Sequence, residues 1–139
     1  GLLERQFRIT FKKASRKEGV TGENLLQALE ARLDNVVYRM GLAKTRTQAR
    51  QFVGHKHILV NGDIVNIASF QVRPGDEIEV RERSKSMEPI QEAIAGSNND
   101  FAWIQFDAAS MKGKFLELPA REAIPENINE QLIVELYSK

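Results

Sequence analysis

The sequence has 139 residues and contains no cysteine. Disulfide bonds, thiolate nucleophiles and cysteine-ligated zinc are therefore excluded, and a reducing compartment such as the cytoplasm is compatible with the chain. No apolar run approaches the roughly 20 residues that cross a bilayer, so we expect no membrane span. Neither a Gly-x-Ser-x-Gly elbow nor a phosphate-binding glycine loop with a lysine is present. We accordingly expect no enzyme, no catalytic residues and no cofactor.

The charges are unevenly distributed along the chain. Residues 1–87 hold 16 Lys and Arg against 10 Asp and Glu, a net charge of +6, whereas residues 88–139 hold 4 against 9, a net charge of −5. A basic portion joined to an acidic one is typical of a nucleic-acid binder whose remainder faces protein or solvent. An anionic membrane is the alternative partner of such a basic portion.

The chain begins with Gly1 and has neither an initiator methionine nor a signal-peptide pattern. We expect that it is a trimmed fragment of a longer protein. Its composition, with 42% hydrophobic and 28% charged residues, is close to the globular average.

Helical spacing dominates the first forty residues. Residues 4–17 predict a short basic helix that is followed by Gly19 and Gly22. Apolar residues then recur at steps of three and four, which predicts one helix over residues 23–40; they are Leu25, Leu29, Leu33, Val36 and Met40. Arg32, Asn35 and Arg39 form a second, polar stripe on the same helix.

The sequence contains a start signal and a stop signal for the next helix. Thr45 is a capping residue, and Gln48 three positions later completes a capping box. Ala49, Phe52 and Val53 supply the buried side, and Gly54 ends the helix. Arg46 and Arg50 stand one turn apart and therefore share a face.

A β-hairpin is predicted around Asn61-Gly62, because this pair tolerates the positive φ angles of a type I′ turn between residues 58–60 and 63–65. Residues 73–76, Arg-Pro-Gly-Asp, predict a second turn. Ile78 and Val80 then alternate with charged residues, as in a half-buried strand.

The acidic half has its own short elements. Residues 87–95 predict a helix that ends at Gly96, and residues 103–106 and 114–118 predict paired strands around residues 111–113. Asn129 can cap a last helix. Phe101, Trp103 and Phe106 have strand-like spacing, so we expect them to pack in the core and not to stack on bases.

The order of these features resembles the S-four RNA-binding module over about fifty residues, from Leu33 to Val80. The resemblance rests on Arg32-Leu33-Asp34, Leu42-Ala43, Thr45-Arg46, Ala49-Arg50, Val60-Asn61-Gly62 and Pro74-Gly75-Asp76. Residues 4–8, 22–25 and 132–139 extend it to the bacterial small-subunit ribosomal protein S-four family. The chain departs from the family because its basic amino-terminal extension is missing and the loop of residues 14–21 is its own variant.

The resemblance implies an α+β fold, with a helical subdomain formed by the amino-terminal helices and the last helix. An inserted subdomain carries further helices and a small, mostly antiparallel sheet. The corresponding divisions are 1–31 with 122–139 for the helical subdomain, 32–85 for the S-four module and 86–121 for the remainder of the insertion.

The resemblance also implies a structural protein of the cytoplasmic ribosome that binds small-subunit ribosomal RNA at a multi-helix junction and nucleates assembly of the subunit. Expected partners are this RNA, neighbouring small-subunit proteins such as the one numbered five, and the protein's own messenger RNA. A membrane partner is not expected.

Cations on a rigid helix face and the free N–H groups of a helix amino terminus suit phosphates, and such a surface reads the shape of A-form RNA more than its sequence. The candidate RNA-binding residues are Arg5, Arg8, Lys12, Lys13, Arg16, Lys17, Arg39, Lys44, Thr45, Arg46, Gln48, Arg50, Gln51, His55, Lys56, His57, Asn61, Arg81, Arg83 and Lys85.

Four alternatives compete with this interpretation. Arg46 and Arg50 by themselves fit a solvated helix face, and only the whole run of features favours RNA. His55 and His57 suggest a metal site, but they lack further nearby ligands and Lys56 would repel a cation, so we expect no metal. The chain could also be the RNA-binding appendage of an RNA-modifying enzyme or a tRNA synthetase, or a protein-interaction or stress-related module that works through its acidic half.

Overall fold

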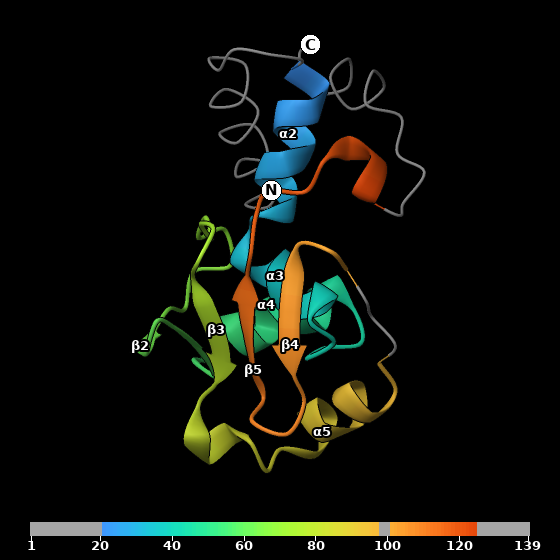
Figure 1. The fold of residues 1–139 in the computed structure, drawn as a ribbon. Helices are drawn as coiled ribbons and strands as arrows, with labels where there is room; N and C mark the ends of the chain where they lie inside the picture. The colour runs from blue at the N-terminus through green and yellow to red at the C-terminus, as the bar shows by residue number, and fades with distance from the viewer. Residues whose placement is uncertain (1–20, 98–100, 125–139) are drawn as a thin grey trace. The chain divides into compact units, whose positions relative to one another are not determined.

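The computed structural model describes residues 21–97 and 101–124, which form helices and an antiparallel sheet (Figure 1). The chain divides into two compact units, one of residues 1–30 with 119–139 and one of residues 31–118. The expected α+β class is confirmed. The three-part division at residues 31, 85 and 121 stays a prediction.

The described part of the first unit contains helix α2 (Thr21–Glu30) and the short 3-10 helix η2 (Arg121–Ala123). The Nε2 atom of Gln27 donates to the carbonyl oxygen of Pro119 at 3.1 Å. Leu25, Leu26 and Ile124 are buried. The helices predicted over residues 4–17 and after Asn129 lie outside the described residues.

The described residues of the second unit form three α-helices and one sheet. The helices are α3 (Leu33–Arg39), α4 (Arg46–Gly54) and α5 (Glu88–Ala95), with the 3-10 helix η1 (Glu82–Ser84) before α5. The strands are β1 (Ile58–Val60), β2 (Asp63–Ile64), β3 (Glu77–Val80), β4 (Ile104–Asp107) and β5 (Lys112–Phe115). All pairs are antiparallel, and their order across the sheet is β2-β1-β3-β5-β4.

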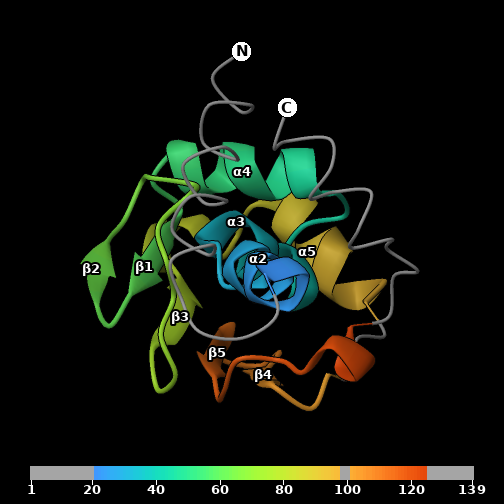
Figure 2. The same cartoon turned by 90° about the horizontal axis from the view of Figure 1, so that it is seen from above.

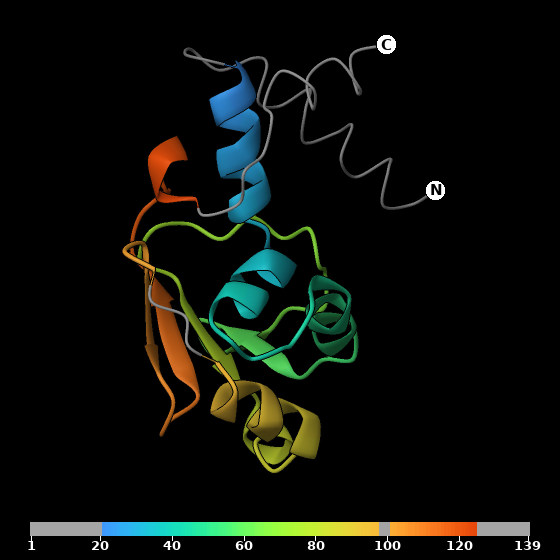
Figure 3. The same ribbon diagram turned by 90° about the vertical axis from the view of Figure 1, so that its right-hand side faces the viewer.

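Helix α3 lies at the centre of this unit. Figure 3 shows α3 and α4 on one side of the sheet, and Figure 2 shows the strands, α4 and α5 arranged around α3. Six of its seven residues are buried as a result, with Leu33, Val36 and Val37 fully inaccessible. The core that forms around α3 includes Trp103 and Phe115, so Trp103 packs in the core as expected.

The single helix expected over residues 23–40 is wrong, because the chain leaves the helical conformation at Arg32 (φ −64°, ψ 140°). Ala31 and Leu33 instead form backbone hydrogen bonds with the segment that follows the hairpin. The Val72 N–H donates to the carbonyl of Ala31 at 2.7 Å, and the Leu33 N–H donates to the carbonyl of Phe70 at 2.8 Å. These long-range bonds break the helix although the apolar spacing continues through it.

The predicted hairpin and turn are confirmed. Asn61 and Gly62 have φ angles of 51° and 87°, and the flanking residues Val60 and Asp63 pair. Gly75 has a φ angle of 95°, and the Asp76 N–H donates to the carbonyl of Arg73 at 3.0 Å. The predicted helix of residues 87–95 is confirmed as α5, which Gly96 caps.

The pairing of the two strands in the acidic half is confirmed, but the expected turn at residues 111–113 is displaced. β5 begins at Lys112, and residues 108–111 form the connection. The carboxylate of Asp107 accepts hydrogen bonds there from the Ala109 N–H at 3.2 Å and the Ser110 hydroxyl at 2.9 Å. These bonds fix the turn earlier than the glycine at position 113 suggests.

Candidate nucleic-acid interface

The amino terminus of α4 has a fixed geometry. The Thr45 hydroxyl accepts a hydrogen bond from the Gln48 N–H at 3.0 Å, which confirms the predicted cap. The Gln48 side-chain oxygen reaches back to the N–H of Lys44 at 2.7 Å, one residue before the cap. Thr45 and Gln48 therefore form the helix end at which Arg46 stands.

Arg46 is exposed but ordered. Its Nε atom donates to the Oδ1 atom of Asn35 at 2.9 Å, and its guanidinium carbon lies 4.6 Å from the centroid of the Tyr38 ring. Both partners belong to α3, so the arginine is attached to the central helix of the unit. Arg50, one turn along α4, is half-buried, and no hydrogen bond or ion pair joins it to the described residues.

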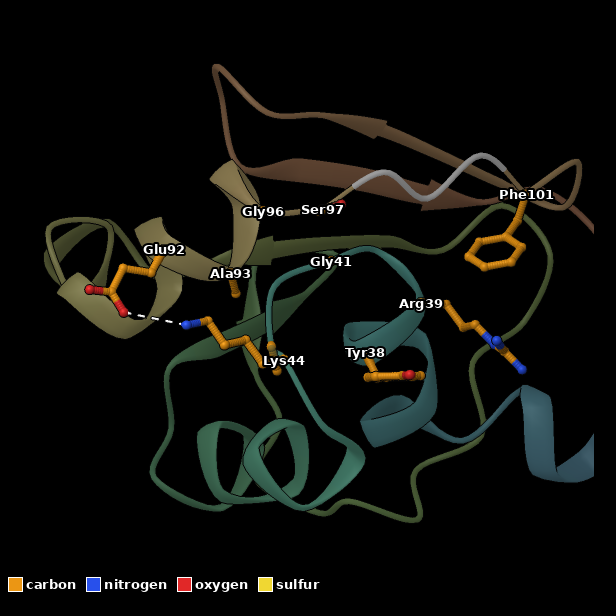
Figure 4. Close-up of a pocket in the computed structure, with 10 residues that line it drawn as sticks. Tyr38, Arg39, Gly41, Lys44, Glu92, Ala93, Gly96, Ser97 and Phe101 are labelled. Carbon is orange, nitrogen blue, oxygen red and sulfur yellow. Dashed lines mark ion pairs between the residues drawn. The ribbon is translucent and has the colours of Figure 1, made fainter. Parts of the chain in front are cut away.

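Lys44 and Arg39 border a pocket of about 340 Å³ between α3 and α5 (Figure 4). The Lys44 ammonium lies 3.6 Å from a carboxylate oxygen of Glu92 in α5, and both side chains are more than half exposed. This surface pair leaves Lys44 accessible, because exposed ion pairs are weak.

Arg39 differs from the other candidate cations because it is only 4% exposed. Its guanidinium lies 5.2 Å from the centroid of Phe101 and 5.9 Å from that of Tyr38. The direct contact of Arg39 with RNA stays a prediction; in the structure its guanidinium lies near two aromatic rings of the same unit. The polar stripe to which it belongs is buried throughout, since Arg32 and Asn35 are each 6% exposed.

A second group of cations lies beyond the carboxyl end of α4. Lys56 is exposed and has a φ angle of 67°, and its carbonyl oxygen accepts a long hydrogen bond of 3.5 Å from Arg81. The Nδ1 atom of His57 lies 2.8 Å from the hydroxyl of Ser84 in η1. The structure thus brings together basic residues from two distant segments of the chain, namely His55, Lys56 and His57 with Arg81 and Arg83.

His57 has a lowered pKa. Burial lowers its pKa from 6.5, and the neighbouring charges of His55, Arg81 and Arg83 lower it further. The ring of His57 also meets the Phe52 ring edge-on at 6.1 Å. His57 is therefore neutral near pH 7, and an approaching phosphate would favour its protonated form.

Three other predicted residues are Lys85, Asn61 and Gln51, and the first two have side-chain contacts within the unit. Lys85 pairs with Glu82 at 3.0 Å. Both polar atoms of the Asn61 side chain are used within the unit: Nδ2 donates to Asp76 at 3.0 Å, and Oδ1 accepts from the Glu77 N–H at 2.9 Å. Asn61 thus joins the hairpin to the neighbouring turn, which gives it a structural role. Gln51 is exposed on α4.

The remaining candidates lie outside the described residues; they are Arg5, Arg8, Lys12, Lys13, Arg16 and Lys17. Among the residues that are described, no group of three His, Asp or Glu side chains could hold a metal ion. No helix in the same part of the chain is long and apolar enough to span a membrane.

Sequence reasoning did not identify Asn35 and Tyr38 as the residues that contact Arg46. The sequence pattern assigns Asn35 to a polar stripe and gives Tyr38 no role. Their spacing of three residues in a helix does predict a shared face. Their contact with Arg46 depends on how α3 packs against α4, which no local pattern encodes.

Two protein-family models match the chain, and together they cover residues 1–78. The model described as "S4 domain" matches residues 31–78, and the model described as "Ribosomal protein S4/S9 N-terminal domain" matches residues 1–30. The break between the two matches coincides with the break between the two compact units, after Glu30.

Curated relatives match this chain over its whole length. "Small ribosomal subunit protein uS4" of Cytophaga hutchinsonii is 61% identical over 140 residues, which cover 100% of this chain and 70% of the relative. The protein of the same name from Parabacteroides distasonis is 62% identical with the same coverage. That of Flavobacterium psychrophilum is 58% identical and is covered to 69%. These names describe a ribosomal protein and no enzyme.

Proposed function

The chain belongs to the uS4 family of small ribosomal subunit proteins, and from this premise we propose that it is a structural, non-catalytic protein that binds small-subunit ribosomal RNA. The observation that carries the proposal is the ordered, exposed Arg46 at the capped start of α4. Together with the cations beyond the other end of the helix, it offers several positive groups on one rigid element. Such groups meet phosphates on more than one RNA strand at fixed spacing.

We further propose that the RNA is a multi-helix junction and that binding nucleates assembly of the subunit. A rigid cationic surface suits a junction because it can distinguish the positions of phosphates, whereas the base edges of A-form RNA are hidden in a deep groove. The predicted contacts with the ribosomal protein numbered five and with the protein's own messenger RNA belong to the same proposal. The acidic segment of residues 88–139, with 9 Asp and Glu against 4 Lys and Arg, supports a protein-facing surface there.

The first experiment measures binding of the full chain to a transcript of small-subunit ribosomal RNA and to a plain RNA duplex of equal length. We expect tighter binding to the transcript at every salt concentration, with a log–log salt slope of about 0.7–0.9 for each phosphate that the protein neutralises. Equal affinity for the two RNAs would overturn the junction proposal, and no binding to either would overturn RNA binding.

The second experiment reverses charge on α4 with Arg46→Glu and Arg50→Glu together. We expect binding to the transcript to be abolished because two positive groups on the proposed surface become negative and repel phosphate. The matched control is Lys112→Glu with Lys114→Glu, which makes the same charge change on strand β5. An equal effect in both double variants would show that net charge, and not the α4 surface, determines binding.

A further inference from the structure

Two unlike contacts with helix α3 restrain the Arg46 side chain. One is directional, the 2.9 Å hydrogen bond from its Nε atom to the Oδ1 atom of Asn35. The other is with a flat surface, the Tyr38 ring whose centroid lies 4.6 Å from the guanidinium carbon. The hydrogen bond sets the direction of the Nε edge and the ring sets the plane, so together they select one orientation of the group.

Both restraining residues are themselves fixed. Asn35 is only 6% exposed, and Tyr38 is half-buried against the core of the unit. They lie one turn apart on α3, the helix that the sheet and the other helices surround. Arg46 is nevertheless an exposed residue, and it stands at the capped start of α4.

Arg50 provides a comparison within the same helix. It lies one turn from Arg46, but it has no hydrogen bond, ion pair or ring contact with the described residues. An arginine of that kind loses side-chain freedom when it binds a phosphate, a cost that corresponds to about two- to tenfold in affinity at 25 °C. Arg46 has already given up that freedom in the unbound chain.

We propose that Asn35 and Tyr38 are positioning residues that preorganise Arg46 for a bidentate contact with an RNA phosphate. The inference rests on the proposed function and assigns roles to two side chains that do not themselves meet the RNA. Lysine cannot replace Arg46 in this arrangement, because an ammonium has neither the Nε donor nor the planar face that the two contacts use. Lysine should be able to replace Arg50, because Arg50 makes neither of these contacts with the described residues.

The experiment measures binding of the full chain to the small-subunit transcript for Asn35→Ala, Tyr38→Leu and Tyr38→Phe, each in the parent and in the Arg46→Ala background. We expect Asn35→Ala and Tyr38→Leu each to weaken binding about two- to tenfold in the parent and to have no effect when Arg46 is absent. Tyr38→Phe keeps the ring and should bind like the parent.

Two further measurements separate positioning from a general disruption of the fold. The salt slope should be unchanged in Asn35→Ala and Tyr38→Leu, because no charge is removed, and should fall by about 0.7–0.9 in Arg46→Ala. Arg46→Lys should weaken binding nearly as much as Arg46→Ala, whereas Arg50→Lys should bind like the parent. Thermal unfolding checks that each variant is folded at the temperature of the binding measurement.

The outcomes are distinguishable. If the parent chain does not bind the transcript, the proposed function fails before the variants are compared. If the parent binds, but Tyr38→Leu binds equally well or weakens binding to the same extent without Arg46, the positioning role is overturned. A decrease of affinity in Tyr38→Phe equal to that in Tyr38→Leu would assign the effect to the hydroxyl group and contradict the stacking argument.

Discussion

Asn61 allows a direct test of whether a residue predicted to contact RNA is instead structural. Its side chain donates to Asp76 and accepts from the N–H of Glu77, at 3.0 and 2.9 Å, and its φ angle is 51°. Each hydrogen bond contributes about 0.5–1.5 kcal/mol, and the left-handed conformation costs alanine about 1–2 kcal/mol. We therefore expect Asn61→Ala to lower the free energy of unfolding by about 2–5 kcal/mol.

The assay is urea unfolding of the parent and variants, followed by RNA binding where each remains folded. Asn61→Gly removes both hydrogen bonds but tolerates the positive φ angle, so it should be destabilised by roughly 1 kcal/mol less than Asn61→Ala. The control is Asn66→Ala, at an exposed asparagine with a negative φ angle, for which we expect a change within about 0.5 kcal/mol.

Binding of the folded Asn61→Ala variant to the transcript should stay within about twofold of the parent, since no phosphate-contacting cation is removed. The opposite pattern, unchanged unfolding with weakened binding, would refute the structural role and restore Asn61 to the RNA surface. A destabilisation of equal size in Asn61→Gly and Asn61→Ala would refute the part of the reasoning that rests on backbone conformation.

Three further predictions concern stability. Thr45→Ala removes the cap of α4 and should cost about 1 kcal/mol in thermal unfolding, whereas Thr45→Ser should not. Gly113→Ala places a Cβ 2.6 Å from the Gln105 carbonyl and 2.8 Å from Met40, and should cost about 1–3 kcal/mol; Gly54→Ala, with open space around it, is the control. The pKa of His57 is lowered in the folded chain, so the unfolded chain binds the proton of this histidine more readily. The free energy of unfolding should therefore fall as the pH drops below 6.5. An equal fall in His57→Gln would show that protonation of His57 is not the cause.

The elements that the sequence predicts well are those whose causes are local. The turn at Asn61-Gly62 forms because two adjacent residues tolerate positive φ angles, and α4 begins at Thr45 because its hydroxyl meets an N–H three residues away. The break between the two helices at Arg32 has a non-local cause. It depends on hydrogen bonds with Phe70 and Val72, nearly forty residues along the chain, while the apolar spacing that suggests one helix runs on undisturbed.

The candidate site also has a part that local sequence predicts and a part that depends on packing. Residue type and helical spacing are enough to place Arg46 and Arg50 on one face of α4, and they give no means to distinguish these two from Arg39. The structure separates all three: Arg39 is buried against aromatic rings, Arg46 is exposed and ordered, and Arg50 is half-buried with no partner among the described residues. The difference arises from packing between α3 and its neighbours, which joins residues that are distant in sequence.

This packing also links the core to the proposed RNA surface. Helix α3 has seven residues, yet it supplies Leu33, Val36 and Val37 to the core and Asn35 and Tyr38 to Arg46. Its first turn is fixed by the buried pair of Arg32 and Asp34, whose side chains lie 3.1 Å apart. A change that shifts α3 within the core therefore moves the two groups that orient Arg46, because packed interiors transmit displacement. Core substitutions in α3 should alter RNA affinity through Arg46 even when the chain remains folded, and substitutions of equal cost in the β4–β5 hairpin should not.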